Sequence, residues 1–295
     1  MKRQYTGTAG KVDNCQVAVM LSYASGQGHV FLDRRLYLPR EWAADAARRE
    51  RADVPEDVAF QTKPQQAKAM LAHAWAQGVP MRWVTGDEVY GDAPALRQAV
   101  ADAGRWYVFA VACTTPVWGT RPATRPPRRT TGGRPQRYAR LAPDAPPAVR
   151  VAAVAAAWPA EAWQRVSVAD GEKGPRVYDW AVARVVESVA HRPGRDAWLL
   201  VRRSVSEPKE VAYYLSNAPA DTPLAALARV AATRYTVEQC IEEAKGEAGM
   251  DQYEVRRWHS WHRHITLAMM AHVWLAAMRA TAVAKKGGPR PRWPR

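Results

Sequence analysis

The sequence MRWVTGDE, residues 81–88, predicts a short apolar strand that ends on two neighbouring carboxylates. A helical pattern over residues 94–103 and an apolar strand over residues 106–112 follow it. Two strands joined by a helix form a unit that packs helices against a sheet. This stretch therefore predicts an α/β fold.

Upstream of this stretch, the pattern predicts a β-hairpin followed by helices. Residues 15–21 (CQVAVML) and 30–38 (VFLDRRLYL) are rich in β-forming residues, and the Ser-Gly-Gln-Gly turn at residues 25–28 separates them. Residues 41–51 are rich in Ala and Arg, and residues 63–77 place apolar side chains on one helix face with a Gly just beyond. The expected order is thus a hairpin, helices and then the β-α-β unit.

Downstream, the composition changes sharply over residues 120–150. This segment contains eight Arg, among them Arg128 and Arg129, and its only acidic residue is Asp144. Such a composition is typical of an exposed basic loop. Two interpretations stay open for it, contact with DNA and a solvated insertion without function.

The remainder of the chain predicts strands and then helices. Strands are expected at residues 166–168, 177–186, 197–203 and 211–215, and helices at residues 222–230, 236–246 and 260–280. We therefore expect residues 1–118 to form the first part of the main domain, 119–150 a basic loop, 151–220 a β-rich insertion, 221–282 the C-terminal helices of the main domain and 283–295 a basic disordered tail.

The charge of the chain indicates a polyanionic partner. It has 43 Lys and Arg against 28 Asp and Glu, a net charge of +15 and a pI near 10.1. This balance is typical of proteins that bind nucleic acid. The alternative is a ribosomal protein, or a soluble basic protein without such a partner.

Cysteine usage and hydropathy indicate a cytoplasmic protein. Cys15, Cys113 and Cys240 are odd in number and widely spaced, so neither a disulfide framework nor a zinc ribbon is expected. The apolar runs at residues 149–158 and 265–278 are shorter than the roughly 18 residues that indicate a membrane span. The N-terminus lacks the pattern of a signal peptide. We therefore expect no membrane partner.

Asp87 is the first candidate for chemistry. It lies just past the carboxyl end of the predicted strand, where open α/β sheets place their active sites. Glu88 stands beside it, and two adjacent carboxylates need solvent, a cation or a metal ion. Asp is also a preferred N-cap residue, so a purely structural role at the start of the next helix is the alternative.

Arg234, Glu238 and Lys245 form the second candidate group. Their spacing places them near one stripe of a predicted helix, beside an apolar stripe that includes Cys240. A glutamate that binds a metal ion, flanked by two cations that hold phosphates, is one interpretation. A surface helix stabilised by ion pairs is the other.

The sequence RRWHSWHRH, residues 256–264, alternates cations and aromatic residues before the last predicted helix. Phosphate contacts by cationic side chains, with the tryptophans packed beneath, are the favoured interpretation. Zinc binding by the three histidines is disfavoured because no carboxylate or Cys lies at ligand spacing. The candidate phosphate-binding residues here are Arg256, Arg257, His262 and Arg263.

Several segments, in this order, resemble insertion-sequence DNA transposases of the DDE superfamily. They are QYTGTAGK (residues 4–11), LYLP (36–39), DEVYG (87–91) and the continuous run KGEAGMDQYEVR (245–256). The chain also matches the superfamily signature Tyr-x2-Arg-x3-Glu-x6-Lys at Arg234, Glu238 and Lys245. Ala231 stands at the Tyr position, which affects a supporting contact more than the chemistry.

This resemblance implies an α/β fold with an RNase H-like mixed sheet, flanked by helices and interrupted by a β-rich insertion. It assigns Asp87 as the second catalytic acid and Glu238 as the third, both as metal ligands. The implied metal is Mg²⁺ (or Mn²⁺), held by carboxylate oxygens. The implied partners are double-stranded DNA, as terminal repeats and target, and a second copy of the chain in a synaptic homodimer.

The first catalytic acid is not matched. In the family it lies on the central first strand, shortly before the segment that starts here at Gln4, and Asp13 and Asp33 belong to later elements. The resemblance therefore predicts that this strand is missing and that cleavage is weak or absent. The alternatives are a DNA-binding remnant without catalysis and another RNase H-like nuclease. Trp163 and Trp180 are candidates for stacking on a displaced base.

Overall fold

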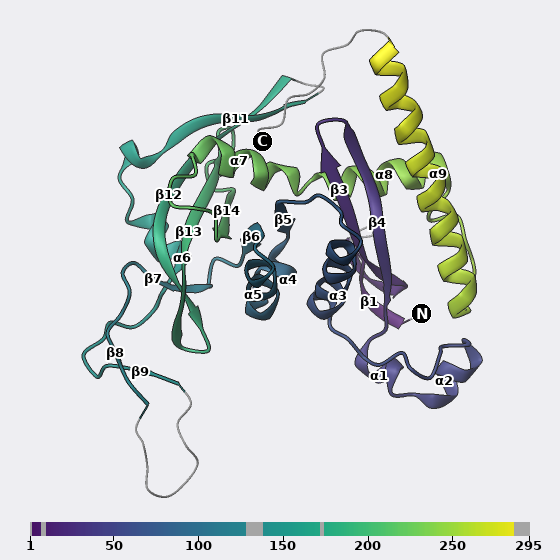
Figure 1. Ribbon diagram of the computed structural model, residues 1–295, viewed down its shortest axis with the longest axis horizontal. Coiled ribbons are helices and arrows are strands. Elements are labelled where there is room, and N and C mark those ends of the chain that lie inside the picture. The colour runs from purple at the N-terminus through teal and green to yellow at the C-terminus, as the bar shows by residue number, and fades with distance from the viewer. Residues whose placement is uncertain (1, 7–9, 128–137, 172–173, 286–295) are drawn as a thin grey trace, which may run out of the picture. The chain divides into compact units, whose positions relative to one another are not determined.

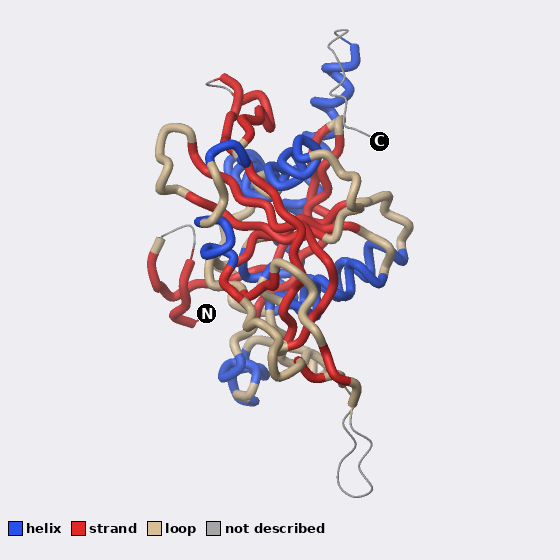
Figure 2. The backbone as a smooth tube through the Cα atoms, turned by 90° about the vertical axis from the view of Figure 1, so that its left-hand side faces the viewer, coloured by secondary structure: helices blue, strands red, loops and turns tan. Residues whose placement is uncertain are grey.

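The computed structural model describes residues 2–6, 10–127, 138–171 and 174–285 (Figure 1). The chain divides into two compact units. Unit 1 comprises Met1–Met81 and Thr233–Arg295, and unit 2 comprises Arg82–Ala232. Strands and helices are both abundant (Figure 2), so the protein belongs to the mixed α/β class, as predicted.

Unit 1 consists of two hairpins and a set of helices. Strands β1 and β2 pair only with each other among the described residues, and so do β3 and β4. The elements are β1 (Lys2–Thr6), β2 (Lys11–Cys15), β3 (Val17–Ser25), β4 (Gly28–Tyr37), α1 (Arg40–Ala43), α2 (Ala46–Arg51), α3 (Lys63–Ala76), α8 (Thr236–Ala248) and α9 (Trp258–Lys285).

The β3–β4 hairpin is the centre of unit 1 because helices pack against it. Ala18 and Met20 lie in one core with buried residues of α8 and α9, among them Cys240 and Ile265. Helix α3 also packs on the hairpin (Figure 1). Because side chains alternate across a strand, the buried Val19 faces away from the Ala18–Met20 core.

Helix α3 follows its local sequence signals. Thr62 accepts a hydrogen bond from the Gln65 amide while the Gln65 side chain accepts one from the Thr62 amide, which forms a capping box. Gly78 follows the helix with a φ of 72°, a conformation that glycine adopts without steric cost. The predicted helix at residues 63–77 is therefore confirmed.

Unit 2 contains a large sheet with helices. Its elements are β5 (Trp83–Gly86), α4 (Glu88–Gly91), α5 (Pro94–Asp102), β6 (Trp106–Val111), β7 (Pro116–Trp118), β8 (Thr124–Arg125), β9 (Arg140–Leu141), β10 (Val149–Arg150), α6 (Val151–Ala156), the 3₁₀ turn η1 (Ala160–Ala162), β11 (Gln164–Gly171), β12 (Gly174–Val189), β13 (Arg192–Ser204), β14 (Val211–Ser216) and α7 (Leu224–Thr233).

The sheet of unit 2 has eight strands in the order β10-β7-β12-β13-β14-β6-β5, with β11 paired to β12. Within the part of the chain that the structure describes, only β5 and β6 run parallel, so the sheet is mixed. A mixed sheet flanked by helices is consistent with the RNase H-like fold that the sequence predicts. The strands expected within residues 151–220 continue into the same sheet as β5 and β6, a continuity that the sequence did not indicate.

Alternation along β6 sends side chains to both faces of this sheet. Val108 packs with Leu227 and Ala228 of α7 on one face. Tyr107 and Phe109 are also fully buried, and their rings stack at 5.3 Å. Because neighbours on a strand point to opposite sides, these two rings lie on the face that does not carry the α7 core.

Buried charges connect that second face to α5. Arg97 donates to Glu187 of β12 at 3.1 and 3.0 Å, and both side chains are at most 5% exposed. Tyr107 donates to the second oxygen of Glu187, and Arg97 also donates to the Gly91 carbonyl at the end of α4. One carboxylate therefore joins β12, β6 and α5, and through Arg97 it fixes α4.

Sequence patterns missed some elements and one property of α9. The β1–β2 hairpin was not expected because its second strand is exposed and polar.

Residues Trp258–Ala282 are long and apolar enough for a membrane span by length and composition, which is weak evidence from a single helix. One face of α9 packs Trp261, Ile265 and Met269 into the unit 1 core. The large apolar residues that are exposed on the described part of α9 are Leu267, Met270, Val273, Trp274 and Met278.

We predict that Glu187→Ala destabilises unit 2 by about 3–5 kcal/mol, because it leaves the buried Arg97 charge without its partner. Urea unfolding of the purified chain measures the change.

Asp196→Ala is the matched control, since Asp196 pairs with Arg121 at 2.8 Å where both side chains are about half exposed. It should cost no more than about 1 kcal/mol. Equal losses for the two variants would contradict the importance of the buried pair.

Candidate functional site

Asp87 lies directly after β5 and begins α4. It is the N-cap residue of this helix, and its Oδ1 accepts a hydrogen bond from the Val89 amide at 2.9 Å. The side chains of Asp87 and Glu88 are both exposed. Burial and the nearby Asp87 charge raise the pKa of Tyr90, so this phenol stays neutral at ordinary pH. The structure thus confirms an exposed carboxylate at a strand end, and it also confirms that Asp87 caps a helix.

The position of Asp87 is fixed by close packing of α4 on the sheet. Gly91, the last residue of α4, is buried against β6. A Cβ added there would lie 1.7 Å from the backbone oxygen of Ala110, a distance that no side-chain adjustment can relieve. Only glycine therefore allows this four-residue helix, with Asp87 at its start, to approach the strand so closely.

Glu238 lies on the exposed side of α8. Its Oε1 accepts a hydrogen bond from Arg234 at 2.8 Å. Burial alone would lower the pKa of Arg234, yet its hydrogen bonds to Tyr235 and Glu238 raise it overall. Arg234 stands in the turn before α8 rather than on the helix, because α8 starts at Thr236. The predicted pairing of Arg234 with Glu238 is present even so.

The opposite side of α8 is buried, as the apolar stripe predicts. Cys240 and Ala244 are fully buried, and Ile241 packs against the same core. Lys245 is partly buried in the last turn, and Gly249 ends the helix with a φ of 60°. The sequence therefore placed the apolar stripe of this helix correctly, whereas Arg234 of the predicted polar stripe lies outside the helix.

The basic segment at residues 256–264 overlaps the start of α9, which begins at Trp258, and its arginines are exposed. Arg256, Arg257 and Arg263 are exposed, and Arg257 pairs with Asp53 at 3.4 Å. His262 differs, because burial and neighbouring arginine charges lower its pKa. Its Nδ1 lies 3.0 Å from the Trp258 carbonyl and its ring packs between two tryptophans. Three arginines are therefore better placed than His262 to present positive charge.

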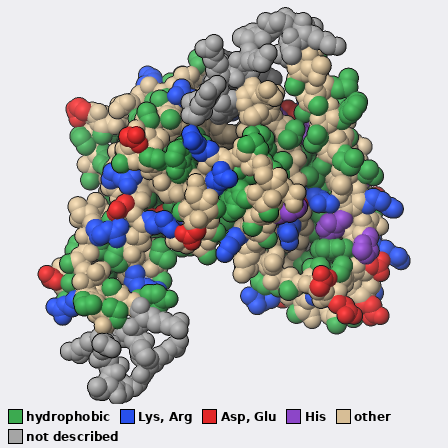
Figure 3. Space-filling view, in the orientation of Figure 1, with side chains coloured by type: hydrophobic (Ala, Val, Ile, Leu, Met, Phe, Trp, Pro, Cys, Tyr) green, Lys and Arg blue, Asp and Glu red, His purple; other side chains and the backbone are tan. Residues whose placement is uncertain are grey.

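The predicted site residues fall in both units. Asp87 belongs to unit 2, whereas Glu238, Arg234 and Lys245 belong to unit 1. The meeting of Asp87 and Glu238 stays a prediction. Arg128 and Arg129 lie outside the described residues. Lys and Arg side chains are visible over both units in Figure 3.

The two candidate stacking residues have different surroundings. Trp180 is only 1% exposed and packs in the core beneath α7, so it is not available to a displaced base. Trp163 is partly exposed, and the Arg203 guanidinium lies 4.1 Å from its ring centroid. The expectation for Trp180 was wrong because a Trp in a strand pattern is as compatible with a core as with a surface.

A comparison with known families identifies the superfamily of the chain. Residues 1–175 match the family model described as "DDE superfamily endonuclease". The chain belongs to the DDE superfamily of endonucleases. Asp87 of this DDE endonuclease lies within the matched residues and Glu238 lies beyond them. Members generally use divalent metal ions and act on DNA. No curated protein matches the chain significantly.

Sequence reasoning missed one polar cluster in this DDE endonuclease. His29, Cys240 and His272 bring ligand atoms within 4.8 Å of one another. Their carboxylate neighbour Glu243 is 214 residues from His29 and 29 from His272 along the chain. No local spacing rule detects such a group. The cluster forms because the fold packs β4, α8 and α9 together.

We predict that Gly91→Ala destabilises unit 2 by about 1–3 kcal/mol, because the added methyl group meets backbone that cannot move freely. Thermal or urea unfolding measures this loss. Gly119→Ala, also in unit 2, is the control because nothing lies within 4 Å of its added Cβ. Unchanged stability in Gly91→Ala would show that α4 does not pack on β6 as described.

Proposed function

We propose that this protein is an insertion-sequence DNA transposase that hydrolyses phosphodiester bonds at the element ends and joins them to target DNA. The observation that carries the proposal is the exposed Asp87 at the end of β5, within a chain that belongs to the DDE endonucleases. The +15 charge supports a DNA substrate. The resemblance of the Arg234–Glu238–Lys245 block to the transposase signature supports the specific reaction.

The proposed metal is Mg²⁺ (or Mn²⁺), held by Asp87 and Glu238. Both are exposed carboxylates, one at a strand end and one on a helix, and such hard oxygen donors fit a hard cation. When bound, the metal would activate the attacking oxygen and stabilise the leaving oxygen. Arg234 holds Glu238 in place through its ion pair, and we assign Arg234 and Lys245 to scissile phosphate groups.

The proposed reaction has two steps. Water attacks phosphorus, its oxygen forms the new bond, and the bond to the 3′-oxygen breaks to release a 3′-hydroxyl. That hydroxyl then attacks a target phosphodiester, so one phosphodiester forms as another is cleaved. We further propose a homodimer that holds two terminal repeats, in the cytoplasm and associated with the nucleoid.

The resemblance assigns only two of the three acids, Asp87 and Glu238. A third carboxylate normally completes the pocket, so we expect weak cleavage from the 295-residue chain alone. Mn²⁺ binding is therefore a better readout than turnover. Binding of DNA without any cleavage, and with no effect of these acids on metal affinity, would favour a remnant that only binds DNA.

We predict that Asp87→Asn and Glu238→Gln each weaken Mn²⁺ binding by at least about a hundredfold and abolish residual cleavage of a terminal-repeat duplex, because each removes a charged metal ligand. The substitutions preserve structure: Asn also caps helices, and Gln still accepts from Arg234. Titration by electron paramagnetic resonance measures the bound Mn²⁺.

Two neighbouring exposed acids serve as matched controls. Glu88→Gln changes the carboxylate beside Asp87, and Glu242→Gln changes one on the same helix as Glu238. Both should keep Mn²⁺ affinity. If all four variants bind Mn²⁺ equally, the assignment of Asp87 and Glu238 is wrong.

We predict that replacing Arg256, Arg257 and Arg263 together with Gln lowers the slope of log affinity against log salt for duplex DNA by about 3. Each phosphate contact contributes about 0.9 to that slope. Fluorescence anisotropy at a series of salt concentrations measures it. A triple variant at Arg82, Arg176 and Arg195, exposed residues of unit 2 outside the basic loop, is the control. Equal slopes for the two triple variants would exclude a localised contact at the start of α9.

A further inference from the structure

The strongest unassigned cluster lies in unit 1, where β4, α8 and α9 meet. His29 of β4, Cys240 of α8 and His272 of α9 place one ligand atom each within 4.8 Å of the others. Among the described residues, no other group of three or more His, Cys, Asp or Glu side chains is so close. Two imidazoles and a thiol are a donor set of zinc sites rather than of magnesium sites.

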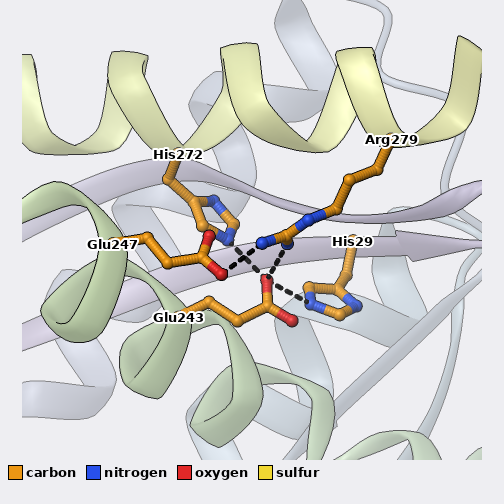
Figure 4. A network of polar contacts seen from close by, with 5 residues as sticks. All are labelled: His29, Glu243, Glu247, His272 and Arg279. Carbon is orange, nitrogen blue, oxygen red and sulfur yellow. Dashed lines mark hydrogen bonds and ion pairs between the residues drawn. The ribbon is translucent and has the colours of Figure 1, made fainter. Parts of the chain in front are cut away.

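Glu243 orients both imidazoles of this cluster (Figure 4). Its Oε2 lies 3.2 Å from His29 Nε2 and 3.0 Å from His272 Nε2, and Arg279 contacts the same oxygen at 3.4 Å. One carboxylate oxygen therefore lies at hydrogen-bond distance from both imidazoles, and the rings are placed to donate N–H bonds to it.

The hydrogen bonds to Glu243 leave a second nitrogen on each ring. A neutral imidazole that donates from Nε2 keeps a lone pair on Nδ1. His272 is fully buried, and its Nδ1 has no hydrogen-bond partner in the protein. A buried polar atom without a partner costs about 1–3 kcal/mol. A metal ion would satisfy that nitrogen, in the carboxylate–histidine–metal arrangement common in zinc proteins.

We propose that unit 1 binds one Zn²⁺ through His29, Cys240 and His272, with Glu243 orienting the two imidazoles. This site is separate from the proposed catalytic pocket, because Glu238 occupies the exposed side of α8 and Cys240 the buried side. The ligands come from three elements, so a bound ion would link α8 both to the hairpin and to α9. His29 and Glu243 are about a quarter exposed, which gives the ion a route in.

The distances require a small adjustment on binding. Zinc ligands at about 2.0–2.3 Å from the metal stand roughly 3.3–3.8 Å from one another. The donors within 4.8 Å must therefore approach by about 1 Å. Binding replaces the proton of the Cys240 thiol, because the thiolate is the form that ligates zinc.

The experiment loads the full chain, stripped of metal, with Zn²⁺ or Co²⁺. We expect one Zn²⁺ per chain by competition with a chromophoric chelator and a rise in melting temperature. Co²⁺ should give the thiolate-to-cobalt charge-transfer band and the intense visible bands of tetrahedral coordination. A chain that binds less than one equivalent, or a cobalt spectrum without the thiolate band, overturns the proposal.

Variants identify the ligands. Cys240→Ser should lose the charge-transfer band. His29→Gln changes a partly exposed ring, so it tests the site even where Cys240→Ser does not fold, and it should weaken Zn²⁺ binding at least tenfold. Glu243→Gln should keep the cobalt band but weaken Zn²⁺ binding by about 10–100-fold. Cys113→Ser and Glu242→Gln are controls and should change neither measurement, because both side chains are exposed and outside the cluster. The thiolate band separates this site from the catalytic proposal, whose ligands are carboxylates. Retention of full affinity in His29→Gln rejects the site.

Discussion

The buried pair of Arg97 and Glu187 is the interaction on which unit 2 depends. It joins the long strand β12 to α5, accepts the Tyr107 hydroxyl of β6, and through the Gly91 carbonyl fixes the end of α4. A buried ion pair is costly to break because either partner alone becomes an uncompensated charge in a medium of low polarity. The turn that carries Asp87 therefore rests on a rigid base rather than on a mobile loop.

Local patterns were sufficient for most elements. Helix α3 has its capping box and terminal Gly78 in the sequence, and β5 is an apolar run that ends at Gly86 and Asp87. The apolar stripe of α8 also follows from helical spacing alone. A few neighbouring residues determine each of these features, so each can be predicted without knowledge of the tertiary structure. The position of Asp87 at a strand end was predictable for the same reason.

Features that depend on distant residues were not predictable. Arg97 and Glu187 are 90 residues apart, and His29 and Glu243 are 214 apart. Their side chains meet only because the sheet order and helix packing bring them together. The prediction for Trp180 was wrong for a related reason. The strand pattern around this residue is the same whether its ring faces a core or DNA, and here the ring is buried because α7 packs against that face of the sheet. Local sequence cannot supply that decision.

The two sides of α8 connect the core of unit 1 to its candidate chemistry. Glu238 lies on the exposed side, whereas Cys240 and Glu243 contact the hairpin and α9 on the other. A helix is stiff, so any shift of its buried side displaces the carboxylate on its exposed side by a similar amount. Metal-binding carboxylates must be held within about 0.5 Å to act together. The contacts made by the buried side are therefore as important for the position of Glu238 as the ion pair that it forms itself.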